Sequence, residues 1–580
     1  MIPLRQYRRL LGNYLQFNSL RFWGLGVTLL GSIALQILNP QILGTFIDTV
    51  SNNGTVDKLI PLAGLFIAIA VVKQVLSVFA TYFGETVAWR ATNSLRYDLM
   101  HHCLNLDLSF YKSYTPGELL ERVDGDVDAI SRFFSQLVIY VVGNGILLLG
   151  ILGILFKENT LAGISLTLFS LFALVLLLRF HGWAIAPWGH YRQMSAEFFG
   201  FIGEHLEGRE DIRGNGAFNY VMTRFYGLFQ RWLPIYQTAR LSSTFLWGGT
   251  VAVFTVGNAI ALFISAYLWQ KQAITIGTAY LIFHYTNLLR QPIEQIREQL
   301  EYLQQVEASI YRIQALFTIT SQLPNSSRAY LPTTEPLSVS CEGVYFGYDT
   351  SEWTLENINF HLPAGSVLGV LGRTGSGKST LARLLLRFYD PQKGSISFNH
   401  TPIAHVPLSQ LRQRVGLVSQ DVQLFQATVR DNLTFFDGTI EDETIWQILQ
   451  LLDLEPWVRS LPRGLDTCLG ADSQGLSAGE AQLLAFARIF LKNPGIVILD
   501  EASSRLDPIT EKKIETAVDQ LLHNRTGIII AHRLQTVERA DQILILERGN
   551  ILEYGDRITL IQNPDSYYNK LLRMMREVNE

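Results

Sequence analysis

The N-terminal half of the chain contains long stretches that are apolar and almost free of charge. Runs such as WGLGVTLLGSIALQIL and LAGISLTLFSLFALVLLL are too long and too uniformly apolar for the helices of a soluble domain. A helix rises about 1.5 Å per residue, so about 20 residues cross a hydrocarbon layer about 30 Å thick. We therefore expect six transmembrane helices, near residues 22–47, 60–83, 134–156, 160–182, 243–268 and 275–291.

The links between these segments alternate between short and long. SNNGTVDK, KENT and QKQA are short, whereas residues 84–133 and 183–242 are long, charged and helical in pattern. Six spans put the arginine-bearing N-terminus, both long links and the C-terminal part on one side, which the positive-inside tendency makes cytoplasmic. We expect the membrane helices to continue into these links and to reverse within 113–130 and 204–217, where prolines and glycines interrupt the pattern.

The C-terminal part has the composition of a soluble domain. At 580 residues the chain is too long for one hydrophobic core, and a net charge of −4 argues against a nucleic-acid partner. Short apolar runs such as SVLGVLG, GIVILD and TGIIIAH alternate with helical patterns, which is typical of an α/β domain with parallel strands. We expect an all-α six-helix transmembrane domain over 1–318, a linker over 319–338 and an α/β P-loop domain over 339–580.

One motif in this last domain specifies a nucleotide site. GRTGSGKST follows the apolar strand SVLGVL, precedes the helical pattern STLARLLLRFY and fits G-x-x-x-x-G-K-[ST]. The glycines let backbone N–H groups surround phosphate oxygens, Lys378 adds positive charge beside the β- and γ-phosphates, and the Ser379 hydroxyl can bind Mg²⁺. The expected nucleotide-binding residues are Gly372, Arg373, Thr374, Gly375, Ser376, Gly377, Lys378, Ser379 and Thr380.

A second strand, GIVILDE, ends in two adjacent carboxylates. Because the predicted strands are parallel, both this strand end and the phosphate loop lie at the carboxyl edge of the sheet. There Asp500 would hold Mg²⁺ through water, and Glu501 would polarise the attacking water as a general base. Together with the phosphate loop, this pair indicates a hydrolase of nucleoside triphosphates.

The order of these motifs resembles that of the nucleotide-binding domain of ATP-binding cassette (ABC) transporters, and the complete chain looks like an exporter-type half-transporter of the multidrug or lipid kind. The resemblance implies further roles. Tyr348 in VYFGY matches the aromatic that stacks on adenine, with Tyr345 as the competing residue, and Gln420 in LVSQDVQLF matches the glutamine that senses Mg²⁺ and the attacking water. Asp507 in SSRLDP matches the aspartate that couples two cassettes, and His532 in IIIAHRLQT matches the histidine that contacts the γ-phosphate.

A further stretch matches the signature of the same family, which is usually written Leu-Ser-Gly-Gly-Gln. A helix begins there, so free N–H groups and the positive end of its dipole face outward. In this family that helix end meets the γ-phosphate held by the partner cassette, which makes a dimer necessary. Ala478, Glu480 and, just upstream, Ala471 depart from the family pattern and leave a homodimer and a heterodimer both open. The signature residues are Leu476, Ser477, Ala478, Gly479 and Glu480.

Polar residues inside the predicted spans are candidates for a transport cavity. Lys73 lies about 20 Å along the second span by helix rise. His284 and Asn287 share one face of the sixth span, and Asn144 and Asn258 occur in two others. We take Lys73, His284 and Asn287 as cavity residues. The alternative is that these polar groups only form hydrogen bonds between helices.

The resemblance implies ATP-driven export of an amphipathic small molecule, lipid or peptide. It implies ATP and Mg²⁺ as cofactors, a second half-transporter and membrane lipid as partners, and a bacterial inner membrane with the cassette in the cytoplasm. SYTPGELL and GREDIRG resemble the coupling helices that contact the cassettes. Three alternatives stay open: a subunit of a heterodimeric exporter, an importer on the same fold, and a regulatory or channel subunit with weak ATPase activity.

Overall fold

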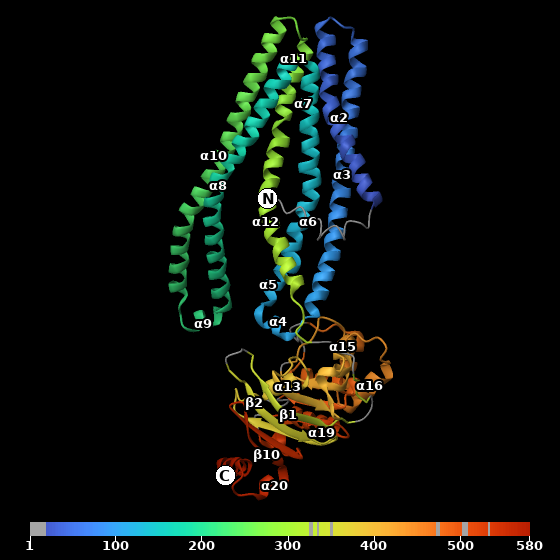
Figure 1. Cartoon of the computed structure of the whole chain (residues 1–580), viewed down its shortest axis with the longest axis vertical. Coiled ribbons are helices and arrows are strands. Elements are labelled where there is room, and N and C mark those ends of the chain that lie inside the picture. Colours follow the sequence, from blue (N-terminus) through green and yellow to red (C-terminus); the bar gives the residue numbers. More distant parts are fainter. Residues whose placement is uncertain are drawn as a thin grey trace. The chain divides into compact units, whose positions relative to one another are not determined.

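The chain forms two compact units (Figure 1). The computed structural model describes residues 19–579, apart from 324–328, 333–335, 349–351, 421, 471–475, 501–507 and 532–533. The first unit comprises Met1–Asn105 and Tyr114–Thr320, and the second comprises Leu106–Ser113 and Ser321–Glu580. A short segment from the N-terminal half of the chain, Leu106–Ser113, therefore belongs to the second unit.

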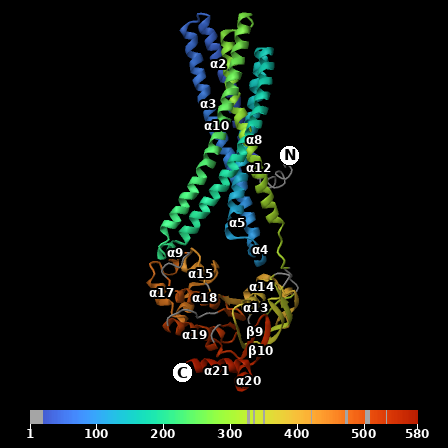
Figure 2. The same cartoon turned by 90° about the vertical axis from the view of Figure 1, so that its left-hand side faces the viewer.

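The first unit is a bundle of long helices. Two helical turns of π type, at Glu121–Asp126 and Leu137–Gly143, precede α6 and α7. The helix α2 packs against α3, and α8 runs beside α10 in both views (Figure 1, Figure 2). The helices are α2 (Ser19–Ser51), α3 (Val56–Leu104), α5 (Pro116–Leu120), α6 (Val127–Gln136), α7 (Asn144–Glu158), α8 (Thr160–Glu207), α9 (Arg209–Gly214), α10 (Phe218–Gln270), α11 (Ile276–Leu288) and α12 (Arg290–Thr318).

Most of the predicted membrane spans lie in helices of sufficient length. Within the part of the chain that the structure describes, five helical stretches are long and apolar enough to cross a membrane. They are Leu20–Ser51, Val56–Leu104, Ile139–Glu158, Thr160–Phe180 and Phe218–Gln270. The helices α3, α8 and α10 contain 49, 48 and 53 residues. At about 1.5 Å per residue they are roughly 70–80 Å long, so they extend well beyond a hydrocarbon layer, as predicted.

Residues 275–291, predicted as the sixth span, form two helices instead of one. The helix α11 ends at Leu288 after 13 residues, and α12 begins at Arg290. Pro292 has no N–H group to donate to the carbonyl of Leu288, which interrupts the hydrogen-bond ladder at this point. About 20 Å of helix in α11 is by itself shorter than the hydrocarbon layer.

The contact between α2 and α11 is close and polar. A Cβ atom on Gly277 would lie 2.2 Å from the carbonyl oxygen of Gly44. The Asp48 carboxylate accepts hydrogen bonds from the Thr275 hydroxyl and the Gly277 N–H, both at 2.7 Å. The small residues allow the helices to approach, and the carboxylate then ties α2 to the beginning of α11.

The second unit contains two β-sheets. The smaller has the order β2-β1-β4-β5 and is antiparallel. The larger has the order β10-β9-β3-β8-β7-β6, in which β10 pairs antiparallel with β9 and the other pairs are parallel. The strands are β1 (Val339–Phe346), β2 (Leu355–Leu362), β3 (Val367–Gly372), β4 (Lys393–Phe398), β5 (Thr401–Pro402), β6 (Val415–Val418), β7 (Ile496–Asp500), β8 (Thr526–Ile530), β9 (Gln542–Glu547) and β10 (Asn550–Asp556).

The larger sheet is covered on both faces. In β7, Ile496 and Ile498 pack in one hydrophobic cluster, whereas Val497 and Leu499 pack in another. Alternate residues of a strand point to opposite faces, so a strand buried on both sides is apolar throughout. The helices of this unit are α4 (Leu108–Ser113), α13 (Lys378–Leu385), α14 (Leu408–Arg414), α15 (Val429–Thr434), α16 (Asp442–Leu451), α17 (Glu455–Ser460), α18 (Ala478–Lys492), α19 (Pro508–Leu522), α20 (Arg557–Gln562) and α21 (Tyr567–Asn579).

Candidate functional site

The loop between β3 and α13 has the backbone of a phosphate-binding turn. The strand ends at Gly372, and Gly377 caps α13 with a φ of 105°. A Cβ atom on Gly377 would lie 2.5 Å from Cδ2 of Leu355, and one on Gly372 would lie 2.4 Å from the carbonyl oxygen of Leu546. Larger residues at these two positions would distort the loop. The glycines therefore keep the first N–H groups of α13 directed at the space in front of the helix.

Lys378 holds this loop together from within. Its side chain is only 5% exposed, and Nζ donates to the carbonyl oxygens of Gly372 at 2.7 Å and Arg373 at 3.1 Å. Ser376 is also buried, and its Oγ has no hydrogen-bond partner among the described residues. A buried hydroxyl without a partner is costly, and this one belongs to the same loop as the buried Lys378, directly before the first N–H groups of α13. The loop is therefore suited to an anion such as phosphate.

The other predicted elements of the site lie along the carboxyl edge of the larger sheet. In the parallel register Val370 of β3 pairs with Ile530 of β8, which pairs with Asp500 of β7. Two strand spacings put the end of β7 roughly 10 Å from the end of β3. Gln420 is exposed and follows β6, which ends at Val418 and pairs with β7. The structure thus brings the phosphate loop, Asp500 and Gln420 to one edge.

The oxygen donors at this edge fit a magnesium ion. Ser379 is exposed in the first turn of α13 and offers a hydroxyl, Asp500 is half-buried and offers a carboxylate, and Gln420 offers an amide oxygen. Hydroxyl, carboxylate and phosphate oxygens are the ligands that Mg²⁺ prefers. Glu501, Asp507, His532 and Ala471 lie outside the described residues, so their roles stay predictions.

Tyr348 lies against the helix that follows the phosphate loop. Its hydroxyl is 3.2 Å from Thr380 Oγ1 and accepts a hydrogen bond from Arg383 Nη1 at 2.9 Å. Tyr345 packs elsewhere, edge-on against Trp353 with ring centroids 5.5 Å apart. Of the two tyrosines considered for the adenine base, the structure places Tyr348 beside the phosphate loop.

The signature stretch forms the beginning of α18. Ser477 is the N-cap residue, Glu480 N–H donates to Ser477 Oγ at 3.2 Å, and the Glu480 carboxylate accepts from Ser477 N–H at 2.8 Å. The Ser477 hydroxyl also donates to that carboxylate, at 2.9 Å. This reciprocal arrangement is a capping box. Ala478 is the first residue of the helix, and Leu476 packs against the hydrophobic core.

Gly479 has a packing role that the sequence reasoning missed. A Cβ atom at this position would lie 2.1 Å from Cγ2 of Thr510, which is on α19. The close approach of α18 and α19 therefore needs a glycine here, apart from any contact with phosphate.

No basic side chain of α18 reinforces the signature turn within the described residues. Arg488 donates to the carbonyl oxygens of Asn432 at 2.7 Å and Gln423 at 3.0 Å. Burial lowers the pKa of its guanidinium. The affinity of the signature turn for an anion consequently depends on backbone N–H groups and the Ser477 hydroxyl.

The predicted cavity residues lie on different helices of the first unit. Asn258 on α10 donates to Asn287 on α11 at 2.9 Å, and His284 lies 3.3 Å from the Tyr280 hydroxyl. Lys73 lies on α3 and is half-buried. The structure brings Asn258 and Asn287 together and shows no contact of Lys73 with either among the described residues.

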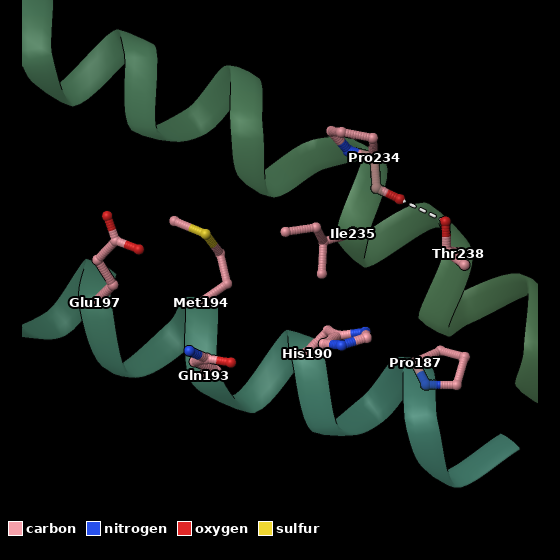
Figure 3. Close-up of a pocket in the computed structure, with 8 residues that line it drawn as sticks. All are labelled: Pro187, His190, Gln193, Met194, Glu197, Pro234, Ile235 and Thr238. Atoms are coloured by element: carbon pink, nitrogen blue, oxygen red, sulfur yellow. Dashed lines mark hydrogen bonds between the residues drawn. The ribbon is translucent and has the colours of Figure 1, made fainter.

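Two pockets had no signal in the sequence. One, of about 830 Å³, lies in the second unit beside the phosphate loop and is lined by residues that include Arg373, Leu546 and Met574. The other, of about 430 Å³, lies between α8 and α10 (Figure 3). Figure 3 shows Glu197 and Met194 of α8 facing Ile235 of α10 across it. Both pockets are lined by residues that are far apart in the sequence and meet only in the folded chain.

Two family models match the chain. The ABC transporter transmembrane region matches residues 22–293, and the ABC transporter model matches residues 355–504. The second match includes the phosphate loop, the signature and the end of β7.

Curated relatives and a solved structure match over most of the chain. An ATP-dependent lipid A-core flippase from Alcanivorax borkumensis is 28% identical over 92% of this chain and 91% of its own length. The uncharacterized ABC transporter ATP-binding protein YfiC of Bacillus subtilis is 28% identical over 92% of this chain and 88% of its own length. The human mitochondrial iron-sulfur clusters transporter ABCB7 is 30% identical over 84% of this chain and 65% of its own length. The fold is similar to that of a bacterial Atm1-family ABC exporter with ATP bound, with a TM-score of 0.80, 24% identity, and coverage of 96% of this chain and 99% of that one.

Proposed function

Because the chain belongs to the ABC transporter family, we propose that it is an exporter that moves an amphipathic small molecule, lipid or peptide across a membrane by alternating access. The two family models together match more than half of the chain. The chain is thus an ATP-hydrolysing transporter with an exporter-type transmembrane domain followed by a nucleotide-binding domain. Its long apolar helices make it an integral membrane protein. We place it in a bacterial inner membrane with the cassette in the cytoplasm.

The observation that carries the proposal is the geometry of the phosphate loop. Lys378 is buried and fixed by the carbonyls of Gly372 and Arg373, and the buried Ser376 hydroxyl of the same loop has no hydrogen-bond partner among the described residues. These donors occur on a chain whose described part contains five membrane-length helices. A phosphate-binding loop on such a chain supports transport driven by nucleotide hydrolysis.

We infer the following division of labour among the residues of this chain. Lys378 neutralises the β- and γ-phosphates, and Glu501 takes the proton of the attacking water as general base. Mg²⁺, held by Ser379, Gln420 and Asp500, would neutralise charge on the phosphates. His532 donates to the γ-phosphate, and Tyr348 stacks on the adenine.

A complete ATP site needs two cassettes. Ser477 and the first turn of α18 offer donors to a γ-phosphate, and in the proposed arrangement that phosphate is held by Lys378 of a second half-transporter. Asp507 couples the two cassettes. The second chain is either a copy of this one or a related subunit, and the two cases differ in whether the purified chain hydrolyses ATP by itself.

Cargo contacts in the first unit would come from Lys73, His284 and Asn287. A polar group inside the hydrocarbon layer is unfavourable unless it forms a hydrogen bond. The hydrogen bond from Asn258 to Asn287 satisfies part of this requirement. If these residues contact cargo, replacing His284 by alanine changes which compounds stimulate ATPase activity. If they only join helices, the same replacement lowers thermal stability and leaves the compound preference unchanged.

Transport in inside-out vesicles tests the proposed function. The expected result is ATP-dependent accumulation of a compound from an amphipathic panel, together with stimulated ATPase activity, both lost in Lys378→Ala and Glu501→Gln. Efflux from such vesicles would instead indicate an importer. An ion current that persists in Glu501→Gln without ATP turnover would identify a channel and overturn the proposal.

A further inference from the structure

The segment Leu106–Ser113 is anchored to the second unit by a buried carboxylate. Asp107 is only 8% exposed, and its Oδ2 accepts hydrogen bonds from the Gln322 N–H at 2.6 Å and the Ser321 hydroxyl at 3.2 Å. Ser109 Oγ donates to its Oδ1 at 2.5 Å. Burial alone would raise the pKa of Asp107, but these hydrogen bonds outweigh burial and hold the pKa below its usual value. The carboxylate therefore fixes the beginning of α4 against the chain that precedes β1.

The other end of α4 places a lysine over the tyrosine assigned to the base. Lys112 Nζ lies 4.7 Å from the centroid of the Tyr348 ring. Lys112 is exposed, and no ion pair competes for its ammonium among the described residues. A cation at this distance from a ring centroid is attracted to the negative face of the ring.

Other contacts hold the Tyr348 ring in a defined orientation. Its hydroxyl is bound to Thr380 and Arg383, both on α13. Phe346 and Tyr389 make perpendicular ring contacts with it, with centroids 5.1 and 5.4 Å away. The ring therefore has little freedom to turn away from Lys112 while α13 keeps its place.

We propose that Lys112 is a positioning residue of the nucleotide site: its ammonium occupies the face of Tyr348 on which adenine stacks, so that the base displaces Lys112 and loosens α4. This inference rests on the proposed role of Tyr348. An ammonium and a base cannot share one ring face, because each needs van der Waals contact with it. The Lys112–Tyr348 contact weakens binding of the base by some factor. By linkage, binding of the base weakens the Lys112–Tyr348 contact by the same factor.

The sign of the effect separates this role from the ordinary role of a basic residue near a nucleotide. A lysine that attracts phosphates strengthens binding, so removing it weakens the binding of every triphosphate. A lysine that competes with the base weakens binding, so removing it tightens the binding of ATP and leaves a triphosphate without a base unaffected. A cation–π contact at an exposed site corresponds to a change of about two- to fivefold in affinity.

Calorimetric titration of the purified full-length protein without Mg²⁺, so that nucleotide is not consumed, tests the proposal. The probes are ATP and inorganic triphosphate. We expect Lys112→Met to bind ATP about two- to fivefold more tightly than the parent chain and inorganic triphosphate equally well. Lys393→Met is the matched control, since Lys393 lies 5.5 Å from the rings of Tyr345 and Trp353 instead of Tyr348. Weaker or unchanged ATP binding in Lys112→Met would overturn the inference.

Hydrogen exchange gives a second readout that does not depend on affinity. In the parent chain, ATP is expected to raise exchange in residues 106–113. In Lys112→Met, exchange in this segment is expected to be high already and to respond little to ATP. Slower exchange on addition of ATP would count against displacement of Lys112.

The variant Tyr348→Leu distinguishes failure of the inference from failure of the proposed site. In that background, Lys112→Met is expected to have no further effect on ATP binding. If Tyr348→Leu binds ATP as the parent does, Tyr348 does not contact the base and both assignments fail. If Tyr348→Leu weakens ATP binding but Lys112→Met leaves it unchanged, only the inference about Lys112 fails.

Discussion

At the scale of single residues, Glu480, which replaces the glutamine of the family signature, binds directly to Ser477. The carboxylate of Glu480 accepts both the N–H and the hydroxyl of Ser477. In the proposed dimer the same hydroxyl faces the γ-phosphate of the partner's ATP. Glu480 therefore stabilises the first turn of α18 but puts a negative charge next to the donor that the phosphate needs.

We expect Glu480→Gln to lower the ATP concentration for half-maximal ATPase activity by about three- to tenfold, because one like-charge repulsion is removed. Glutamine still completes a capping box, so the thermal stability is expected to change little. Steady-state ATPase assays on the purified protein measure the effect. Glu443→Gln, which removes an exposed carboxylate from the first turn of α16, is the control. A higher half-maximal concentration in Glu480→Gln would show that the carboxylate helps instead of hindering.

Asp107 supports a prediction about pH. Its pKa is lowered in the folded chain, so its contribution to stability is present above the unfolded pKa of about 4 and is lost as pH falls through the lower folded pKa. Hydrogen-exchange protection of residues 106–113, corrected for intrinsic rates, should thus be constant from about pH 8 to pH 5. Asp107→Asn should reduce protection over this whole range. Loss of protection in the parent chain near pH 6 would contradict the assignment to this carboxylate.

At the scale of elements, the junction of α18 and α19 depends on the absence of a side chain. The space at Gly479 is filled by the methyl group of Thr510, and the two helices carry residues of the same hydrophobic core. In the family signature, a glycine at this position is usually explained by its contact with phosphate. Here packing alone is sufficient to require it.

We expect Gly479→Ala to destabilise the second unit by about 1–3 kcal/mol, as overpacking of a close contact does. Thr510→Ser removes the methyl group that clashes, so the double variant should recover most of the lost stability. Thermal unfolding of the four proteins forms a double-mutant cycle. If the two substitutions are additive, steric contact between these residues does not explain the glycine.

At the scale of the whole molecule, the proposed ATP site is shared between two chains. Lys378 lies in α13, and Ser477 is the N-cap residue of α18. In the proposed dimer, the Lys378 of one chain belongs to one ATP site and the Ser477 of the same chain belongs to the other. A chain with a defective Lys378 can therefore still supply an intact Ser477 to the site of its partner, and the reverse also holds. Two inactive chains can therefore complement each other if the partner is a copy of this chain.

We expect Lys378→Ala and Ser477→Arg each to abolish ATPase activity when expressed alone. Co-expressed in equal amounts, they should recover up to roughly a quarter of the parent activity, since half of the dimers are mixed and these have one intact site of two. ATPase assays on the purified mixture, with the same tag on both chains so that all three dimers are recovered, measure the effect. No recovery, with normal dimer formation, would contradict a shared site in a homodimer.

Local sequence was sufficient for the phosphate loop, the alternation of strands and the membrane-length helices. Glycine spacing before Lys378 and the period of apolar residues act on neighbouring backbone, so a short stretch specifies them. The two helices formed by residues 275–291 differ from the single predicted span, although the local cause of the break, the missing N–H group of Pro292, is present in the sequence.

Only the tertiary structure decided the contacts between residues far apart in the chain. It placed Tyr348 instead of Tyr345 beside α13, put Lys112 over the Tyr348 ring, and paired the buried Asp126 with Arg312, whose Nε lies 2.8 Å from the carboxylate. The physical reason is that such contacts depend on how separate helices and strands pack, which no local pattern encodes. The sequence by itself determined the phosphate-binding motif and the apolar helices that enter a membrane; the packing of its elements decided which side chains lie around Tyr348 and the phosphate loop.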